Sequence, residues 1–200
     1  PAFRGMDEDL SFTVASLLTD AVTTTDELIP SGETSSYRSN PLKLAEFALS
    51  RKDPMYVGRA KAVKEEGFPS GVEFNKDNTT YGSVVCSIKP GDGSAREQAA
   101  SCQRVLGGVA NIAKEYATKR YRSNLINWGM IPFLAEKNDF EVGDLIYIEN
   151  IKNLIKEGAK TFKATVYGKK TKDITLFMDA LTDSEKEIIL KGCLINYYKS

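Results

Sequence analysis

The hydrophobic residues in the first half of this chain follow strand-like and helix-like spacings in turn. Compact apolar runs predict β-strands at residues 11–18 and 83–88, and apolar residues at helical spacing predict helices over residues 41–51 and about 95–106. A more charged segment, residues 51–67, predicts a second short helix between them. Strands that alternate with helices in this way indicate an α/β domain.

The second half of the chain is richer in strands. A polar loop is predicted at residues 67–82. Four strand-like stretches come after it, and a helix that ends at Gly129 follows the first of them. The last predicted helix starts at a capping-box pair, Thr182 and Glu185. The strand-like stretches are "GGVANIAKEYA", "DLIYIENI", "TFKATVYG" and "DITLFMDA". We therefore expect a partly antiparallel sheet here, and a single domain over residues 1–200.

Composition and charge argue against several classes of protein. The chain has 200 residues, of which 42% are hydrophobic and 27% charged, as expected of a soluble globular domain. Lys and Arg together number 27, as do Asp and Glu, so the net charge is zero and favours neither nucleic acid nor an acidic membrane surface. No stretch approaches the ~20 apolar residues of a membrane span. The first ten residues lack an initiator Met and the apolar core of a signal peptide, which favours a fragment of a longer protein.

The cysteine and histidine contents limit the available chemistry. The three cysteines are widely spaced and form no CxxC pair, so we expect free thiols in a reducing compartment, the cytoplasm, and no metal site in this chain. The chain contains no histidine, which excludes Ser-His-Asp and Cys-His catalysis. Acid–base chemistry must therefore come from Ser, Lys, Tyr, Cys, Asp or Glu.

The segment "GDGSAREQAA" (residues 91–100) joins a predicted strand to a predicted helix and has three interpretations. A phosphate cradle is weakly supported, because the third glycine of a dinucleotide site and the Gly-Lys-Ser/Thr of a P-loop are both missing. In a plain turn, Ser94 would cap the following helix. In a carboxylate site, the helix N-terminus and the planar fork of Arg96 would bind the anion, and Ser94 would act as a base with strong electrostatic support.

A second segment, "TTDELIPSGETSSYR" (residues 24–38), could complete such a carboxylate site. It places Asp26 and Arg38 on either side of a Pro-Ser-Gly turn. Taken separately, Asp26 is interpreted as a loop cap and Arg38 as a solvated surface cation. Together with Ser94 and Arg96, they would form a polycarboxylate pocket with two arginine forks, one base and one orienting aspartate.

These motifs resemble the C-terminal swivel domain of aconitase-type hydratases. That family carries T-T-D-H-I, G-x-G-S-S-R-E-H-A-A, L-G-G and N-L-x-N-x-G-[IL]-[LI]-P, and the matching stretches here are "TTDELI", "GDGSAREQAA", "LGG" and "NLINWGMIP". The resemblance covers nearly all of the chain and extends to its C-terminal helix. It implies an α/β swivel-type fold of layered, mixed parallel and antiparallel sheets with flanking helices, at the C-terminal end of a multidomain enzyme.

The resemblance also implies an activity and roles for individual residues. Ser94 corresponds to the base that takes the substrate proton, Arg38 and Arg96 to the arginines that grip substrate carboxylates, and Asp26 to an aspartate that pairs with a histidine from elsewhere in the enzyme. The implied reaction is the reversible dehydration of a hydroxy-polycarboxylate such as citrate or isocitrate, as in the tricarboxylic acid cycle. A [4Fe-4S] cluster, bound by cysteines of other domains, would act on the departing hydroxyl. This chain would therefore be inactive alone.

Three residues depart from the family pattern. Ala95 replaces the second serine, and Glu27 and Gln98 replace histidines, so the base and the arginine forks are kept while the substrate stays open. Two alternatives to a fused aconitase remain. One is a free-standing small subunit of an isopropylmalate or homoaconitate isomerase, paired with a cluster-bearing large subunit. The other is a non-catalytic, regulatory relative.

Overall fold

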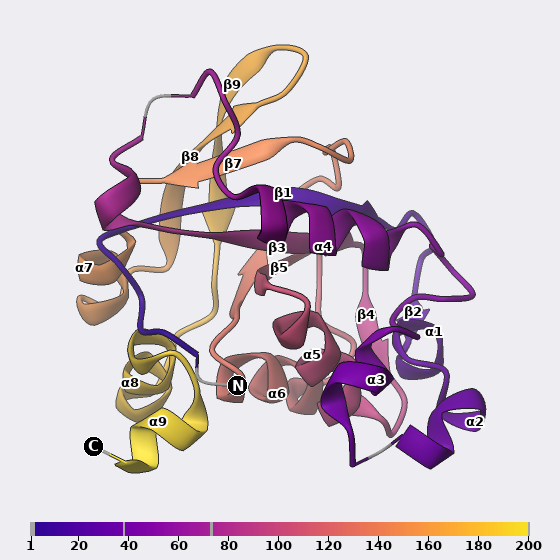
Figure 1. The fold of residues 1–200 in the computed structure, drawn as a ribbon. Helices are drawn as coiled ribbons and strands as arrows, with labels where there is room; N and C mark the ends of the chain where they lie inside the picture. Colours follow the sequence, from indigo (N-terminus) through magenta and orange to yellow (C-terminus); the bar gives the residue numbers. More distant parts are fainter. Residues whose placement is uncertain (1–2, 38, 73, 200) are drawn as a thin grey trace.

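The computed structural model describes residues 3–37, 39–72 and 74–199, and its main strands close into a barrel (Figure 1). These strands are β1 (Asp9–Leu17), β3 (Thr79–Ser87), β5 (Gly108–Ala113), β6 (Ile131–Leu134), β7 (Leu145–Ile148), β8 (Thr161–Tyr167) and β9 (Thr171–Phe177). Around the barrel they follow the order β1-β3-β5-β6-β9-β8-β7. β1, β3, β5 and β6 run parallel to one another, and the other neighbouring pairs are antiparallel.

The predicted α/β class is confirmed, but the predicted layered sheets are wrong. The sheet curls into a barrel because β7 pairs with β1, from Leu10 opposite Ile148, and because β9 pairs with β6 at Leu134 and Phe177. The alternation of apolar residues along a strand is the same in an open sheet and in a closed one. Closure depends on pairings between distant segments, which the pattern of a single strand does not encode.

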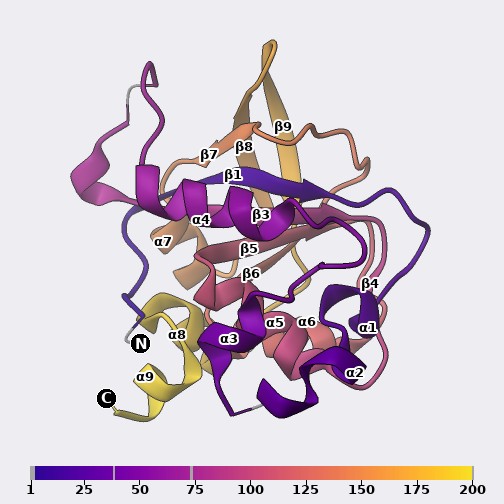
Figure 2. The ribbon, with the colours of Figure 1, turned by 45° about the vertical axis from the view of Figure 1, so that its right-hand side comes forward.

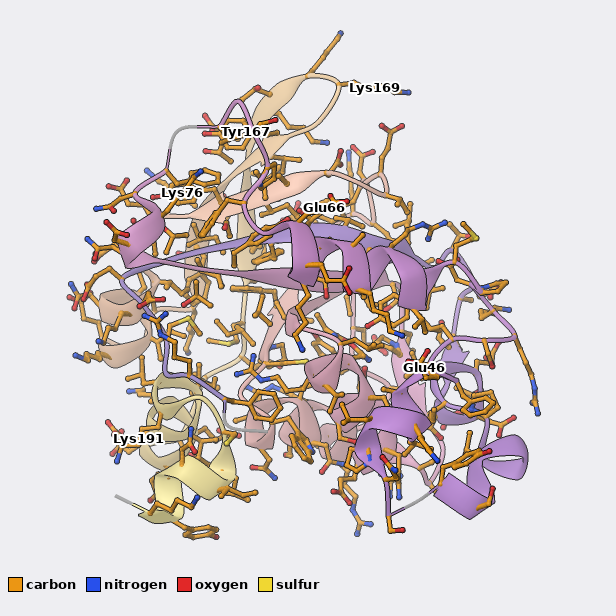
Figure 3. All side chains as sticks on the ribbon, in the orientation of Figure 1. Glu46, Glu66, Lys76, Tyr167, Lys169 and Lys191 are labelled. Atoms are coloured by element: carbon orange, nitrogen blue, oxygen red, sulfur yellow. The ribbon has the colours of Figure 1, made fainter. Side chains whose placement is uncertain are left out.

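The strands from the first half of the chain are buried on both faces. In β3, Val84 and Cys86 belong to the cluster inside the barrel, whereas Val85 between them packs under the outer helices. This arrangement explains the unbroken apolar run that predicted a strand there. The hairpin of β8 and β9 has one buried face, and Lys169 at its turn points into solvent (Figure 3). The predicted antiparallel second half is thereby confirmed.

The helices cover the barrel on one side and at its ends (Figures 1 and 2). They are α1 (Thr25–Leu28), α2 (Ser31–Thr34), α3 (Pro41–Ala45), α4 (Tyr56–Glu66), α5 (Arg96–Val105), α6 (Lys119–Asn127), α7 (Ile151–Lys156), α8 (Asp183–Lys191) and α9 (Leu194–Lys199). α4 packs on β1 and β3, and α5 packs between α3 and α6. A short separate sheet is formed by β2 (Thr23–Thr24) and β4 (Pro90–Asp92).

Two predicted helices end differently in the structure. The helix predicted over residues 41–51 stops at Ala45 and continues as turns, with Leu49 in a left-handed conformation (φ 56°). The predicted C-terminal helix begins with the expected capping box but is divided at Gly192, whose φ is 101°. A glycine with positive φ is a common way to end a helix. The turn after α3 packs against α1, where the Leu49 backbone N–H donates to the Leu28 carbonyl at 2.9 Å.

Candidate functional site

The two segments singled out in the sequence lie side by side, just beyond the carboxyl ends of β1 and β3. They are joined by the short parallel pair of β2 and β4, in which Thr23 pairs with Pro90 and its backbone N–H donates to the Lys89 carbonyl at 2.9 Å. In α/β proteins, ligands commonly bind beyond the carboxyl ends of parallel strands. The local topology thus places both segments where such a site is expected.

A surface depression of about 360 Å³ lies between these segments. One wall is formed by Thr24, Thr25 and Asp26, and the other by Asp92, Gly93, Ser94 and Ala95. Asp26 and Ser94, more than sixty residues apart in the sequence, therefore share one depression. Both side chains are exposed to solvent in this chain.

The glycines of "GDGS" permit the close approach of the two walls. Gly93 has a φ of 135°, and a Cβ atom there would lie 2.2 Å from the Thr25 Oγ1 atom on the opposite wall. Gly91 has a φ of 102°, and a Cβ atom there would lie 2.4 Å from the ring of Tyr121. Any larger residue would be strained by its backbone conformation and would also push its neighbour away. These glycines therefore allow the two walls of the depression, and the loop and Tyr121, to lie in close contact.

The structure contradicts the interpretation of Ser94 as a helix cap. α5 begins at Arg96, and the residue at its cap position is Ala95, which has no side-chain hydrogen bond of the capping kind. Ser94 lies one residue before that position, because the helix starts later than the pattern predicted. Its hydroxyl is consequently placed in the depression and not at the cap position.

The two predicted carboxylate-binding arginines are Arg96 and Arg38. Arg96 is partly exposed at the first turn of α5, and its Nη1 atom donates a hydrogen bond to the Gly93 carbonyl beside Ser94. The guanidinium thus folds back over the loop that carries Ser94. Arg38 lies outside the described residues, so its proposed contact with substrate stays a prediction.

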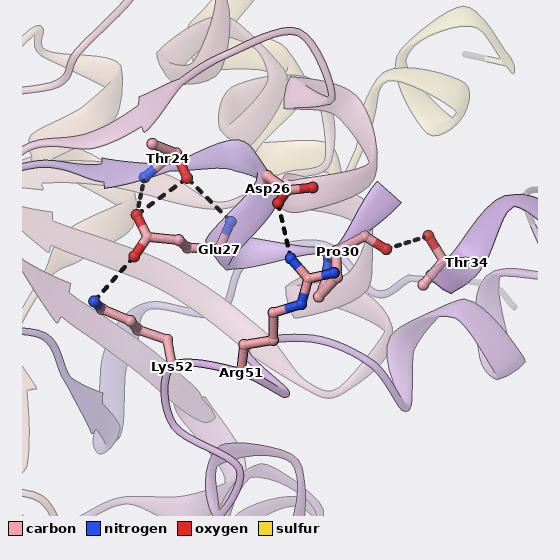
Figure 4. A network of polar contacts seen from close by, with 7 residues as sticks. All are labelled: Thr24, Asp26, Glu27, Pro30, Thr34, Arg51 and Lys52. Atoms are coloured by element: carbon pink, nitrogen blue, oxygen red, sulfur yellow. Dashed lines mark hydrogen bonds and ion pairs between the residues drawn. The ribbon is translucent and has the colours of Figure 1, made fainter. Parts of the chain in front are cut away.

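Glu27, which stands where the family pattern has histidine, is held by its own chain (Figure 4). Its carboxylate accepts hydrogen bonds from the Thr24 backbone at 3.0 Å, Thr24 Oγ1 accepts from the Glu27 backbone at 3.1 Å, and Lys52 forms an ion pair with the carboxylate at 3.0 Å. The Thr24 backbone hydrogen bond, with help from Lys52, lowers the pKa of Glu27. Because this pKa is lowered on folding, the stabilisation is present at neutral pH and is lost as the pH falls through it. Glu27 thus completes the capping box of α1, whose N-cap residue is Thr24.

Asp26 also has a partner in its own chain. The Arg51 Nη1 atom lies 3.0 Å from the Asp26 Oδ2 atom (Figure 4). Arg51 was not predicted as part of the site, since it falls in a segment predicted to be helical and only the turn after Ala45 brings it to α1. The one sequence signal was two consecutive cations, Arg51 and Lys52, which are more often a solvated surface.

A buried polar network supports the loop of Ser94 from behind. The Tyr121 hydroxyl donates to Asn111 Oδ1 at 2.9 Å and accepts from Gln103 Nε2 at 2.9 Å, and Asn111 Nδ2 donates to Gln103 Oε1 at 2.6 Å. All three residues are buried, and the ring of Tyr121 lies against Gly91. The network therefore connects α5, β5 and α6 beneath the candidate site.

We predict that Tyr121→Phe lowers the free energy of unfolding by about 1–3 kcal/mol, because it removes the donor to a buried Asn111 oxygen while the ring stays in place. Urea unfolding at unchanged m-value would measure the loss. Tyr198→Phe is the matched control, since Tyr198 is 76% exposed and should change stability by less than about 0.5 kcal/mol. Equal stability of the Tyr121→Phe variant and the wild type would contradict the role of the network.

The described residues do not fit an iron–sulfur cluster. Within residues 3–37, 39–72 and 74–199, no three His, Cys, Asp or Glu side chains are grouped so that they could hold a metal ion. Cys86, Cys102 and Cys193 are free and buried, and burial raises the pKa of the Cys102 thiol to about 12. The described part of this chain therefore presents no ready-made set of cluster ligands.

Within the same described ranges, every helix is too short or too polar to cross a lipid bilayer.

Comparisons with known proteins agree with this fold. Residues 42–138 match the profile of the family described as Aconitase C-terminal domain. The chain is 36% identical over 135 residues to the methanogen homoaconitase small subunit of Methanocaldococcus jannaschii, with 68% of each chain covered. It is 32% identical over 154 residues to the 3-isopropylmalate dehydratase small subunit of Nautilia profundicola, with 76% of this chain and 81% of that one covered.

A solved structure extends the similarity to the fold. The crystal structure of 3-isopropylmalate dehydratase from Methanocaldococcus jannaschii superposes with a TM-score of 0.62 at 26% identity, and the match covers 96% of this chain and 93% of that one. The fold and the sequence together define a domain of the aconitase type, a class of hydro-lyases. The chain belongs to the aconitase C-terminal domain family, among whose members are the small subunits named above.

Proposed function

We propose that this chain is the small subunit of a hydro-lyase of the isopropylmalate or homoaconitate type, which reversibly dehydrates a hydroxy-polycarboxylate. The observation that carries the proposal is the shared depression of Ser94 and Asp26, with Arg96 folded over the same loop. The small-subunit relatives, matched over about two thirds or more of their lengths, support a separate subunit. They support it better than the fused aconitase that the sequence motifs first suggested.

Ser94 is the proposed base. A hydro-lyase must remove a proton from a carbon next to a carboxylate, and the anion that develops needs fixed positive groups close by. In this chain they are the free N–H groups at the start of α5, a ten-residue helix, and the Arg96 guanidinium. These groups favour the alkoxide of Ser94, which is held at the same place and forms when the hydroxyl loses its proton to solvent; the alkoxide takes the proton from the substrate carbon and so returns to the hydroxyl.

A partner is part of the proposal, because the site is incomplete in this chain. Ser94 and Asp26 are exposed, whereas electrostatic stabilisation of this kind is strong only where water is excluded. The partner would cover the depression, supply a histidine to Asp26 and carry the [4Fe-4S] cluster that the family resemblance implies. When bound, the cluster would act as a Lewis acid on the departing hydroxyl.

The substrate is proposed as a class, with a preference inside it. The small-subunit relatives favour a 3-isopropylmalate or homoaconitate type of substrate over citrate. Ala95 agrees with a substrate other than citrate, because it lacks the hydroxyl that the aconitase pattern places between the base and the arginine. Assay of the complex with its large subunit on 3-isopropylmalate, homoisocitrate, citrate and isocitrate tests this preference. Faster turnover of citrate than of the other acids would contradict it.

We expect Arg96→Lys to raise KM by about 10- to 100-fold while kcat changes by only a few-fold. A charged hydrogen bond contributes about 1.5–3 kcal/mol, and a lysine cannot reproduce the two-point grip of a guanidinium. Steady-state kinetics of the complex measure both constants. Arg120→Lys on the exposed face of α6 is the control, and it should leave KM unchanged. An unaltered KM in Arg96→Lys would remove Arg96 from substrate binding.

A further inference from the structure

The side chain of Tyr121 lies beneath the loop that carries Ser94. Tyr121 is part of α6, which packs on β4, and β4 leads directly into that loop (Figure 2). A Cβ atom at Gly91 would clash with three atoms of the tyrosine side chain, so the Gly91 backbone rests directly on it. Tyr121 is fully buried and does not line the depression. It therefore touches the loop without reaching the space that a substrate would occupy.

The Tyr121 side chain is held in place from both ends. Its hydroxyl accepts a hydrogen bond from Gln103 Nε2 and donates one to Asn111 Oδ1, both at 2.9 Å. Its backbone N–H donates to Thr118 Oγ1 at 3.1 Å, and this contact caps α6. Because the interior of a protein is close-packed, a side chain bound in this way has little room to move. The ring is therefore a fixed surface for the loop above it.

The other contacts of the loop act on different parts of its backbone. The Ala117 backbone N–H donates to the Pro90 carbonyl at 2.9 Å, one residue before Gly91. Beyond it, Gly93 lies against Thr25 and accepts a hydrogen bond from the Arg96 guanidinium. These contacts hold the loop at its two ends. Between them, the Tyr121 side chain limits how far Gly91 can move toward the interior.

We infer that Tyr121 is a positioning residue for the reaction proposed above, on which this inference rests. Its ring sets the depth of Gly91, and so of the Ser94 hydroxyl three residues later, in the depression. A smaller side chain leaves a cavity beneath Gly91, and the surrounding structure relaxes partly into such a cavity. A misplacement of about 1 Å at an active site can lower the rate by about 100-fold. Tyr121 acts through Ser94 and not on the substrate.

The test compares two variants in the complex of this chain with its large subunit, at a temperature at which both are folded. Tyr121→Leu removes the ring and should lower kcat roughly tenfold with KM changed less than about twofold, because Arg96 is held by α5 between α3 and α6. Tyr121→Phe keeps the ring and should keep kcat within about threefold of the wild type, although it loses the hydrogen bonds of the hydroxyl. Wild-type kcat in Tyr121→Leu, or an equal loss in both variants, would overturn the inference.

Phe162→Leu is the matched control for a cavity as such. Phe162 is 1% exposed and belongs to the cluster inside the barrel, whereas Tyr121 belongs to the cluster under the outer helices. Loss of this ring should lower the midpoint of urea unfolding about as much as Tyr121→Leu does, and it should leave kcat unchanged. An equal loss of kcat in Phe162→Leu would show that kcat follows stability and would overturn the inference.

Two further variants test the same contact from the side of the loop. Gly91→Ala pushes the loop away from the ring and should lower kcat by about tenfold or more, so it decides the question if Tyr121→Leu does not fold. Wild-type kcat in Gly91→Ala would overturn the inference. In a Ser94→Ala background, Tyr121→Leu should cause no further loss of kcat, because the group that it positions is absent. A further loss of about tenfold there would also overturn it.

The outcomes separate this inference from the proposed function. An active wild-type complex that loses activity in Ser94→Ala but keeps it in Tyr121→Leu would reject the inference alone. A wild-type complex that turns over none of 3-isopropylmalate, homoisocitrate, citrate and isocitrate would reject the proposed function and this inference with it.

Discussion

Ser94→Ala is expected to lower kcat of the assembled enzyme by roughly 10²- to 10⁴-fold, the range usual for loss of a positioned acid–base group. The substitution removes the hydroxyl from the shared depression, while α5 and Arg96 are kept. KM should therefore change little. Both constants follow from the rate of formation of the unsaturated acid as a function of substrate concentration.

The control for this substitution is another exposed serine. Ser70 lies in the loop after α4, away from the depression, and Ser70→Ala should show wild-type kinetics. Exchange of the substrate hydrogen with D₂O gives a second readout, because a missing base abolishes exchange as well as dehydration. Near-normal kcat or exchange in Ser94→Ala would mean that another group is the base.

Gly93→Ala is expected to have the second largest effect, on both stability and activity. A Cβ atom at this position would lie 2.2 Å from Thr25 Oγ1, and the φ of 135° is itself unfavourable for alanine. Overpacking of this kind lowers the free energy of unfolding by about 1–3 kcal/mol. Since the clash lies between the two walls of the depression, kcat should fall with it. Thermal or urea unfolding and the same kinetic assay measure the two effects.

Two companion variants make the interpretation of Gly93→Ala specific. Thr25→Ala removes the Oγ1 atom, so the Gly93→Ala and Thr25→Ala double variant should recover part of the stability lost by the single one. Gly58→Ala on α4 has open space around it, and it should leave stability unchanged or slightly higher. A Gly93→Ala variant with wild-type stability would show that the two walls are less closely packed than described.

Much of the secondary structure follows from local patterns. The apolar run that contains Val84 and Val85 lies in β3, and the start of α8 has the capping box predicted at Thr182 and Glu185. These signals are local, because they depend on residues within one turn or one strand. Closure of the barrel is not local, since it needs β7 to pair with β1 from more than a hundred residues away.

In the candidate site, too, some features follow from sequence motifs and others depend on contacts between distant segments. Motifs recognised in the sequence placed Asp26 and Ser94 in one site, and the structure brings both to one depression. Arg51 was missed because its contact with Asp26 depends on a left-handed Leu49 inside a segment predicted to be helical. Glu27 receives a structural explanation as the cap of α1, whereas nothing in the structure explains Gln98.

The most direct test of the account is reconstitution of the enzyme from its parts. This chain and its large subunit would be assayed separately and together on 3-isopropylmalate, homoisocitrate, citrate and isocitrate, with the Ser94→Ala chain as the matched control. The account predicts turnover of at least one acid by the wild-type pair only, and loss of that turnover with Ser94→Ala. Equal turnover by the large subunit alone, or by the pair that contains Ser94→Ala, would contradict it.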